Sequence, residues 1–469
     1  MDFKRKAYNQ LKEWKDRKGH KPLIVEGLRQ VGKSYIVAKF AEENYENHII
    51  LDFRHRKELR LCFKGNLDVD QIVSSLEPYL PEGKFVPGKT VLIFEEIGDC
   101  AEARTSLKSF CLDGRYEVIA TGSLLGVDNY RRKSKLPVPT GYEEHLEMTS
   151  MDFEEFLWAI GTPESALASL KEAALEIKEL PPALANYFSE AIKQYMVVGG
   201  MPDAVKAFLE SNRNYLKSRS VQEELIKDYR ADFGRFVDED GNEKIDYDLQ
   251  SKLNQIFDAI PSQLSRENDV QRFKLSEMSK KARYAQYANA FDWLTKAGLV
   301  LLVRNLKAIE SPLQGNAEQN AFKAFVSDPG LLMSLFPLAT LQDFLLNRLG
   351  SRKGALYENL LASMIAKAGF PLFYYGNYEK HLEIDFLLEG KDGIILLEEK
   401  STNGKMAASR SIMEGNSPFK ASRCVKINSS GVGIGSFYTS YPQYMAPFFL
   451  ESEMQKLKEG LFGKNISLS

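Results

Sequence analysis

Up to about residue 125 the chain alternates between short apolar runs and stretches whose apolar positions recur at helical spacing. The apolar runs lie at residues 22–26, 48–53, 89–96 and 116–123. Helical spacing is found at residues 3–20, 33–43, 73–80 and 104–111. Runs that are apolar throughout are typical of parallel strands buried on both faces. The alternation therefore predicts an α/β domain with a doubly wound parallel sheet.

The pattern becomes mainly helical from about residue 150 to residue 254, where apolar positions recur every three or four residues. The clearest helical stretches are residues 153–160, 183–196 and 205–233. The sequence VGGMP at 198–202 interrupts them as a turn. Residues 249–310 predict two or three further helices followed by a strand at 298–304. Several helices closed by a strand are typical of a winged helix.

A third type of pattern begins near Gly354, where residues 356–368 show helical spacing. Runs of β character follow at residues 371–376, 381–388 and 394–401. The turn EGKDG between the last two runs predicts an antiparallel hairpin, so this region is of the α+β type. The changes of pattern divide the chain into four regions at residues 1–150, 151–248, 249–345 and 346–469.

Composition and net charge narrow the class of protein. With 469 residues the chain is long enough for about two to four domains. Its 44% hydrophobic and 27% charged residues are typical of a soluble globular protein. A net charge of −2 excludes a molecule that is basic overall, although it is compatible with a local basic face.

The cysteines and the N-terminal segment indicate a cellular location. The four cysteines form no C-x-x-C pair and are too few for a disulfide framework in a chain of this length, which fits a reducing cytoplasm. Residues 1–21 are charged and lack the apolar segment of a signal peptide. No run approaches the roughly 20 apolar residues that a membrane span requires. We expect a cytoplasmic protein with no membrane partner.

A phosphate-loop motif follows the first predicted strand. The sequence GLRQVGKS at 27–34 fits G-x-x-x-x-G-K-[ST] and opens a predicted helix. In such loops the backbone N–H groups cradle the phosphates of ATP or ADP, the lysine reaches the β- and γ-phosphates, and the hydroxyl ligates Mg²⁺. The predicted nucleotide-binding residues are Gly27, Leu28, Arg29, Gln30, Val31, Gly32, Lys33, Ser34 and Tyr35. The motif predicts ATP and Mg²⁺ as cofactors, with Ser34 as a metal ligand.

Two acidic residues end the apolar run VLIFEE, at the edge of the sheet where ligands gather in open α/β folds. Glu95 stands where ATPases commonly have a metal-bound aspartate, and its longer side chain departs from that pattern. Glu96 stands where they place the carboxylate that polarises the attacking water. We expect Glu95 to contribute to Mg²⁺ binding, and Glu96 and Lys33 to act in phosphoryl transfer.

Polar residues also end the next strand. Thr121 and Ser123 occupy the place of a group that contacts the γ-phosphate, or they mark a strand-to-turn boundary. Arg131 and Arg132 are candidates for arginine fingers, acting within the chain or on a neighbouring subunit. The second arrangement requires a homo-oligomer, and a solvated loop is the alternative to both.

Several motifs resemble a family of prokaryotic AAA+-type ATPases. They are GLRQVGKS, the strand ending FEEI, ATGSLLGV at 120–127, MDFEEFLWA at 151–159 and VGGMPDAV at 198–205. Segments at 260–268, 287–300 and 354–400 also match the family's pattern, so the resemblance covers nearly the whole chain. It implies that the four regions are, in order, a P-loop AAA+-like ATPase domain, a helical extension, a winged-helix-like domain and a C-terminal domain of unknown function.

In the C-terminal region Asp385, Glu398 and Lys400 form the pattern D…E-x-K. Alternate residues of a strand share a face, so Glu398 and Lys400 are expected to point together toward Asp385 across the hairpin. Two carboxylates that hold Mg²⁺ and a lysine that positions water are suited to phosphodiester hydrolysis. Glu358, in the preceding helix, is a further candidate metal ligand. The region thus resembles the PD-(D/E)XK nuclease fold, and a solvated strand end is the alternative.

Two acids near this pattern have no assigned role. Glu399 is expected to face away from Glu398, whereas Glu383 is expected to share the face of Asp385. Either of them can be a bystander in the scheme.

The middle of the chain carries a basic stretch with aromatic residues. Its members are Lys274, Lys280, Lys281, Arg283 and Arg304, with Tyr284 and Tyr287 between them. The charges suit contacts with DNA phosphates that carry no sequence information. The spacing of Tyr284, Tyr287 and Phe291 favours a hydrophobic core stripe for the aromatic residues.

These observations lead to a primary hypothesis and an alternative. The primary hypothesis is an ATP-binding and ATP-hydrolysing AAA+-type protein that binds DNA and cleaves it through a metal-dependent, nuclease-like C-terminal domain. The alternative is a nucleotide-dependent switch or scaffold in which that domain is a non-cleaving interaction module.

Overall fold

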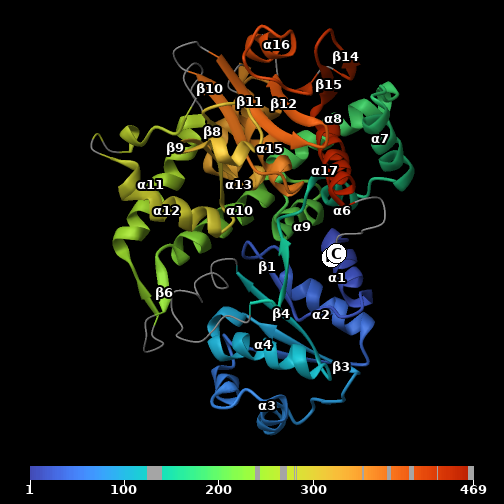
Figure 1. Ribbon diagram of the computed structural model, residues 1–469, viewed down its shortest axis with the longest axis vertical. Helices are drawn as coiled ribbons and strands as arrows, with labels where there is room; N and C mark the ends of the chain where they lie inside the picture. Colours follow the sequence, from blue (N-terminus) through green and yellow to red (C-terminus); the bar gives the residue numbers. More distant parts are fainter. Residues whose placement is uncertain are drawn as a thin grey trace.

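The computed structural model of the chain describes residues 1–123, 140–237, 243–264, 272–278, 280, 282–350, 353–377, 382–400, 406–429 and 431–462. Two large β-sheets lie toward opposite ends of the molecule, with helices of the middle region between them (Figure 1). Blue and cyan elements surround the N-terminal sheet, and orange strands form much of the C-terminal sheet (Figure 1).

The N-terminal sheet has five parallel strands in the order β2-β3-β4-β1-β5. They are β1 (Leu23–Gly27), β2 (Asn47–Asp52), β3 (Thr90–Glu95), β4 (Glu117–Ser123) and β5 (Glu144–Met148). The predicted parallel sheet is confirmed, and its first four strands coincide with the predicted runs. The pattern did not predict β5, because its sequence EHLEM alternates in polarity at the sheet edge and contains no apolar run.

Helices cover both faces of this sheet. They are α1 (Lys6–Asp16), α2 (Lys33–Asn44), α3 (Val69–Leu76) and α4 (Ala101–Asp113), with the short 3-10 helices η1 (Lys57–Phe63), η2 (Glu77–Tyr79) and η3 (Ile97–Asp99). Leu23 and Val25 of β1 belong to a core that continues into the middle and C-terminal regions. Ile24 points the other way, into a separate core with residues of α3 and α4. The N-terminal sheet therefore shares one of its faces with the rest of the chain.

The region after β5 is helical, as predicted. Its elements are α6 (Phe153–Ala159), α7 (Glu164–Glu176), α8 (Pro182–Val198), α9 (Pro202–Glu210) and α10 (Tyr215–Asp232), followed by the hairpin β6 (Arg235–Val237) and β7 (Glu243–Ile245). The predicted turn between α8 and α9 is confirmed. A Cβ on Gly200 would lie 2.0 Å from the Met151 carbonyl oxygen, so the close approach requires glycine. The stretch predicted at 205–233 is broken between α9 and α10, where Asn212 and Arg213 have positive φ angles.

The second sheet has eight strands in the order β14-β15-β13-β12-β11-β10-β8-β9. The strands are β8 (Val300–Leu306), β9 (Ala317–Val326), β10 (Phe373–Asn377), β11 (Leu382–Gly390), β12 (Gly393–Lys400), β13 (Arg423–Asn428), β14 (Gly433–Ile434) and β15 (Thr439–Pro442). The helices of this part are α11 (Tyr247–Leu264), α12 (Tyr284–Lys296), α13 (Pro329–Leu335), α14 (Leu338–Leu345), α15 (Lys353–Lys367), α16 (Ala407–Met413) and α17 (Ala446–Phe462), with the 3-10 helices η4 (Leu275–Glu277), η5 (Leu313–Asn316) and η7 (Gln443–Met445).

This sheet crosses the predicted boundary between residues 345 and 346. The strand predicted at 298–304 is present as β8, and it pairs antiparallel with β9 on one side and parallel with β10 on the other. Periodicity along the sequence does not report such pairing between distant strands. The winged helix therefore stays a prediction, because its expected closing strand is shared with the C-terminal sheet. The hairpin predicted at 381–401 is confirmed by the antiparallel pairing of β11 with β12.

A partly buried lysine joins the C-terminal region to the end of the first domain. The Lys367 Nζ, at the end of α15, donates to Ser150 Oγ over 2.9 Å and to the Met151 carbonyl over 3.0 Å. It also contacts the Tyr195 hydroxyl of α8 at 2.9 Å. These bonds fix the position of α15 relative to both neighbouring regions. Among the described residues, no helix combines the length and the apolar character needed to span a membrane.

Candidate functional site

The predicted phosphate loop connects the end of β1 to the start of α2, at the carboxyl edge of the parallel sheet. Gly27 ends the strand with a φ of 155°, and a Cβ there would lie 2.0 Å from the Met148 carbonyl oxygen of β5. Gly32 has a φ of 92° and directly precedes α2. Both glycines of the motif are therefore required by the backbone.

The side chain of Lys33 folds over the loop. Its Nζ donates to the carbonyl oxygens of Gly27 and Leu28 over 3.1 and 2.8 Å. Burial lowers the pKa of Lys33 to about 8, and the negative charge of Glu96 partly opposes this shift. A bound phosphate would bring further negative charge and favour the ammonium form. The lysine thus lies where a phosphate group needs a positive charge.

The acids at the end of β3 lie beside the loop. Burial raises the pKa of Glu95, and the nearby Ser34 side chain partly opposes this shift. The two predicted ligands of the ATP-bound Mg²⁺ are therefore adjacent. Glu96 follows the strand with a φ of 51°, a left-handed conformation that is uncommon for a non-glycine residue.

An arginine that the sequence did not single out holds Glu96. The Nη2 of Arg54 lies 3.0 Å from Glu96 Oε2, and its Nε donates to Asp99 Oδ2 over 3.0 Å. Arg54 lies two residues after the end of β2, so it reaches the same edge of the sheet as Glu96. Its signal in the sequence was its position, because it lies just beyond the end of a parallel strand, as the catalytic candidates do.

The remaining predicted residues of this site lie at different distances from the loop. Ser123 is the strand neighbour of Gly27 in the β1–β4 pairing, so it stands beside the loop, and Thr121 is buried in the same strand. Tyr35 is 56% exposed, so its side chain faces solvent. Arg131 and Arg132 lie outside the described residues.

The middle of the loop contacts parts of the chain that the motif does not include. The Tyr229 hydroxyl of α10 donates to the Arg29 carbonyl over 2.9 Å, and the Arg5 guanidinium donates to the Val31 carbonyl over 2.8 Å. The side chain of Arg29 also forms an ion pair with Asp232 of α10. Nothing in the spacing of the sequence indicates Arg5 or Tyr229.

The C-terminal candidates converge as the strand geometry predicted. The Lys400 Nζ lies 2.7 Å from Asp385 Oδ2 and 2.8 Å from Glu398 Oε2. Asp385 also accepts the Glu399 backbone N–H over 2.9 Å, and Glu398 accepts a hydrogen bond from the Ser409 hydroxyl of α16. Because both carboxylates contact one ammonium group, they lie within reach of a single cation.

The two carboxyl groups respond differently to burial. Burial, with help from the charge of Asp385, raises the pKa of Glu398 to about 7, and Lys400 only partly opposes the shift. Burial also acts to raise the pKa of Asp385, but the charges of Lys400 and Lys323 outweigh it and lower the value. For Lys400 burial is outweighed by its two acidic partners, which raise its pKa. The lysine therefore stays protonated.

A second lysine, which is fully buried, completes this cluster. Lys323 of β9 is 2% exposed, and its Nζ lies 2.7 Å from Glu358 Oε1 and 2.6 Å from Glu383 Oε1. Burial raises the pKa of Glu358 to about 7 against the charge of Lys323. Lys323 was not predicted from the sequence, although a single charge within the apolar run AFKAFV was a usable signal.

The two bystander acids lie as their strand positions predicted. Glu383 shares the face of Asp385 and joins the Lys323 pairs, whereas Glu399 accepts a hydrogen bond from Gln443 over 3.3 Å. Within the described residues, no group of three His, Cys, Asp or Glu side chains is arranged to hold a metal ion. Lysines instead stand between the carboxylates: Lys400 between Asp385 and Glu398, and Lys323 beside Glu358.

In the middle region the aromatic residues are part of the core. Tyr287 and Phe291 are buried, and Tyr284 stacks on Phe291 with ring centroids 6.3 Å apart. The core stripe predicted for these residues is confirmed. Arg304 donates to the Gln319 carbonyl over 3.2 Å, within the β8–β9 pair. Lys281 lies outside the described residues.

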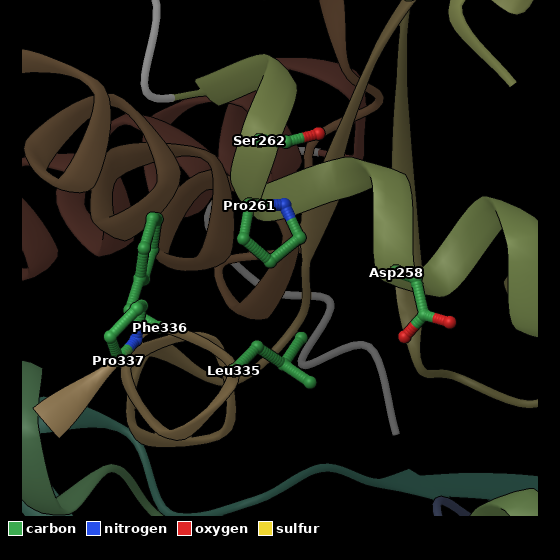
Figure 2. A pocket seen from close by; sticks show the side chains of 6 residues that line it. All are labelled: Asp258, Pro261, Ser262, Leu335, Phe336 and Pro337. Atoms are coloured by element: carbon green, nitrogen blue, oxygen red, sulfur yellow. The ribbon is translucent and has the colours of Figure 1, made fainter.

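A pocket of about 270 Å³ lies between α11 and the end of α13 (Figure 2). Its lining residues are Asp258, Pro261, Ser262, Leu335, Phe336 and Pro337. The carboxylate of Asp258 points away from Phe336 in Figure 2, and it pairs with Arg230 at 2.6 Å. The pocket therefore lacks the converging charged groups of the two sites above.

Three segments of the chain match known protein families. Residues 19–157 match the family described as AAA domain. Residues 189–342 match a domain of unknown function, DUF8612, and residues 353–441 match another, DUF4143. No curated protein matches the chain. The first segment contains the phosphate loop and both acids of β3.

Solved structures with partial similarity include a Walker-type ATPase of Pyrococcus abyssi, which is 15% identical with a TM-score of 0.42 and covers 71% of this chain and 96% of that one. The ORC2 protein of Aeropyrum pernix, in ADPNP–ADP complexes, is 13% identical with a TM-score of 0.38. The match covers 74% of this chain and 93% of the ORC2 chain. The ORC1 protein of the same organism, in complex with DNA, is 11% identical with a TM-score of 0.27. The match covers 74% of this chain and 94% of the ORC1 chain. Because these TM-scores are low, no property of those proteins is carried over.

The loop geometry and the AAA match agree. A strand, a glycine-bounded loop with a buried lysine, and a helix follow one another within residues 19–157, with acids at the end of a neighbouring parallel strand. This arrangement binds the phosphates of a nucleotide and supports phosphoryl transfer. The N-terminal part of the chain is therefore an AAA-type P-loop ATPase domain, and the protein is a nucleotide-binding ATPase.

Proposed function

We propose that this ATPase acts on DNA and that its C-terminal region cleaves phosphodiester bonds. The observation that carries the proposal is the convergence of Asp385 and Glu398 on Lys400, on two paired strands of a mixed sheet. The order of elements around them is a helix, three antiparallel strands, a helix and a parallel strand, from α15 to β13. This order supports a PD-(D/E)XK-like fold.

In the ATPase site, each predicted residue has a role that follows from its position. Lys33 neutralises the β- and γ-phosphates, and Ser34 and Glu95 would hold Mg²⁺, which supplies further charge neutralisation. Glu96 orients and deprotonates the water that attacks the γ-phosphate. Ser123, beside the loop, contacts the γ-phosphate oxygens. Arg54 holds the Glu96 carboxylate until nucleotide and water are in place.

In the C-terminal site, Asp385 and Glu398 would hold a divalent cation, which supplies Lewis-acid activation of the phosphate. Glu358 would be a third ligand only if its pair with Lys323 opened. Because Lys400 stays protonated beside two carboxylates, it stabilises negative charge on the phosphate and does not accept the proton of the attacking water. Water attacks phosphorus as its proton passes to the solvent, and the bond to the leaving oxygen breaks with the electron pair remaining on that oxygen.

DNA is the proposed partner because the middle region carries basic residues on the side of the C-terminal sheet formed by β8 and β9. Lys274, Lys280 and Arg283 precede or begin α12, which leads into β8. Contacts from such residues to the phosphate backbone would position DNA without selecting a sequence. In this proposal the regions 1–150, 151–248, 249–345 and 346–469 have the functions of ATPase, extension, DNA-binding module and cleavage module.

One observation favours the alternative, a nucleotide-dependent switch or scaffold. The acids near the C-terminal site are already paired, since Lys323 contacts Glu358 and Glu383 while Lys400 contacts Asp385 and Glu398. In a non-cleaving module the lysines would be permanent substitutes for the metal, and the cluster would serve only to hold β9, α15 and the hairpin together.

A single preparation of the full chain separates the two functions. ATP hydrolysis and cleavage of single- and double-stranded DNA are measured with Mg²⁺ and with Mn²⁺, with and without ATP. Lys33→Ala is expected to abolish hydrolysis, and Asp385→Ala to abolish cleavage while hydrolysis continues. Intact DNA in every condition with the wild-type chain would rule out cleavage and leave the switch. Unchanged ATP turnover in Lys33→Ala would contradict the ATPase roles assigned above.

A further inference from the structure

The carbonyl groups of the phosphate loop are held from outside by two buried side chains. When backbone N–H groups converge on a ligand, the carbonyl groups of the same loop point away from it and need donors elsewhere. The Tyr229 hydroxyl donates to the Arg29 carbonyl over 2.9 Å, and Arg5 Nη1 donates to the Val31 carbonyl over 2.8 Å. Between them, Gln30 has a φ of 63°. Donors on both sides therefore fix the left-handed turn of the loop.

Tyr229 is well suited to this task. The residue is 4% exposed, and burial raises the pKa of its hydroxyl above the ordinary value, so the hydroxyl remains a donor. Its ring belongs to the core that connects the regions of the chain. The hydroxyl is thus held in place by packing that does not involve the loop.

Other residues on the same face of α10 contact the loop through side chains. Asp232 pairs with Arg29, and Asp228 accepts a hydrogen bond from Gln30 Nε2 over 3.0 Å. Positions 228, 229 and 232 lie on one side of a helix. Since α10 belongs to the helical extension, a separate region of the chain completes the phosphate loop.

Arg5 provides a comparable support from the other side. It is 6% exposed, and besides the loop it contacts the Thr149 carbonyl over 2.7 Å and Glu155 Oε1 over 3.1 Å. Its guanidinium therefore connects the loop to the segment that leads from β5 into α6. This contact lies at the junction of the ATPase domain with the helices.

We propose that α10 is part of the nucleotide site: Tyr229 is a positioning residue that keeps the loop N–H groups directed toward the phosphates, and nucleotide binding in turn stabilises α10. The inference extends beyond the proposed function, because it requires only nucleotide binding and does not depend on DNA cleavage.

Without the Tyr229 hydroxyl the Arg29 carbonyl loses its buried donor, and the ligand-free loop spends less time in the binding conformation. The apparent nucleotide affinity falls in proportion to the fraction of molecules whose loop is in the binding conformation. Linkage is reciprocal, so a contact that favours nucleotide binding must itself be favoured by nucleotide.

The test compares Tyr229→Phe with the wild-type full chain by titration calorimetry, using ADP and Mg²⁺. Loss of one buried hydrogen bond predicts about three- to tenfold weaker ADP binding. Tyr116→Phe is the matched control, because its hydroxyl donates to the Phe85 carbonyl over 3.3 Å at the opposite edge of the same sheet. This control is expected to bind ADP like the wild type, with a similar small change in melting temperature.

Amide hydrogen exchange provides the second measurement. ADP is expected to slow exchange in α10 of the wild type and to slow it less in Tyr229→Phe. If Tyr229→Phe binds ADP as tightly as the wild type, or if the two variants lose affinity equally, Tyr229 does not position the loop. Unchanged exchange of α10 in the wild type on ADP binding would overturn the reciprocal part of the proposal.

Discussion

The phosphate loop and the C-terminal cluster both place a lysine near acids carried by strands of a sheet, but they use the lysine in opposite ways. Lys33 donates to two backbone carbonyls, which are neutral partners. Lys400 bridges two carboxylates, and Lys323 does the same nearby. The first site therefore keeps positive charge for an anion, whereas the second neutralises its charges internally.

This difference has consequences for ligand binding. A triphosphate that enters the first site exchanges weak carbonyl contacts of Lys33 for strong charge-assisted ones. A divalent ion that enters the second site must share or displace ammonium groups that already satisfy the acids. We therefore expect nucleotide binding to need little rearrangement and metal binding to depend on movement of Lys323 or Lys400.

The largest expected effect concerns Glu96. Glu96→Gln keeps the shape and a hydrogen-bond acceptor for Arg54 but removes the base, so ATP hydrolysis is expected to fall by about 10²–10⁴-fold. ADP affinity should change by less than about threefold, because charge at the phosphates comes from Lys33. Steady-state hydrolysis and calorimetric titration check the two values. This outcome would show that Glu96 acts in ATP hydrolysis and is not needed to neutralise the charge of Lys33.

Asp99→Asn is the matched control for Glu96→Gln. Asp99 accepts a hydrogen bond from Nε of the same Arg54 side chain whose Nη2 contacts Glu96. A loss of hydrolysis as large as that of Glu96→Gln would mean that the Arg54 network, and not the Glu96 base, limits the rate. The contrast between the two sites would then be weaker than the geometry indicates.

The next effect is on stability and concerns Lys323. Lys323→Met leaves Glu358 and Glu383 without their buried cation, and the free energy of unfolding is expected to fall by about 3 kcal/mol. Denaturant unfolding monitored by circular dichroism measures the change. Mg²⁺ is expected to raise the melting temperature of this variant more than that of the wild type, because a site for a cation has been vacated.

The triple variant Lys323→Met, Glu358→Gln, Glu383→Gln removes the charges of the acids as well and is the control. It is expected to recover most of the lost stability, since no buried charge remains unpaired. If Lys323→Met alone costs less than about 1 kcal/mol, the two acids are solvated or protonated, and the cluster does not depend on internal neutralisation.

Local patterns were sufficient to predict the parts of both sites that lie on one strand or one turn. The motif 27–34 carries its own glycines, and the alternation of β12 brings Glu398 and Lys400 to one face. These residues could be predicted because their geometry depends on a few neighbours in sequence. The antiparallel hairpin followed for the same reason.

The supporting residues could not be predicted in this way. Arg5, Tyr229 and Lys323 reach the sites from segments that are distant in sequence, and their roles depend on tertiary packing. The same limit applies to β9, which was not predicted, and to the pairing of β8 with β10 across a predicted domain boundary. Periodicity describes which face of an element is buried but not which element covers it.

The smallest expected effect is a pH dependence of stability that distinguishes the N-terminal sheet from the C-terminal cluster. His145 of β5 lies between Glu26 and Glu143, with its Nδ1 2.9 Å from Glu26 Oε1. Hydrogen bonds to Glu143 and Glu26 raise its pKa from 6.5 to about 9, although burial opposes them. Because the folded-state pKa is the higher one, this stabilisation is complete below pH 6.5 and disappears as the pH rises through about 9.

His145→Asn should therefore lose about 0.5 kcal/mol of stability at pH 6 and almost none at pH 10, the value being small because the side chain is partly exposed. Unfolding curves at several pH values measure this, with His48→Asn on β2 as the control. Lys400 keeps its charge over the same range, because its acidic partners raise its pKa. Alkaline pH should thus weaken the N-terminal sheet before the C-terminal cluster. If His145→Asn loses the same stability at about pH 6 and at about pH 10, packing and not charge explains the role of His145.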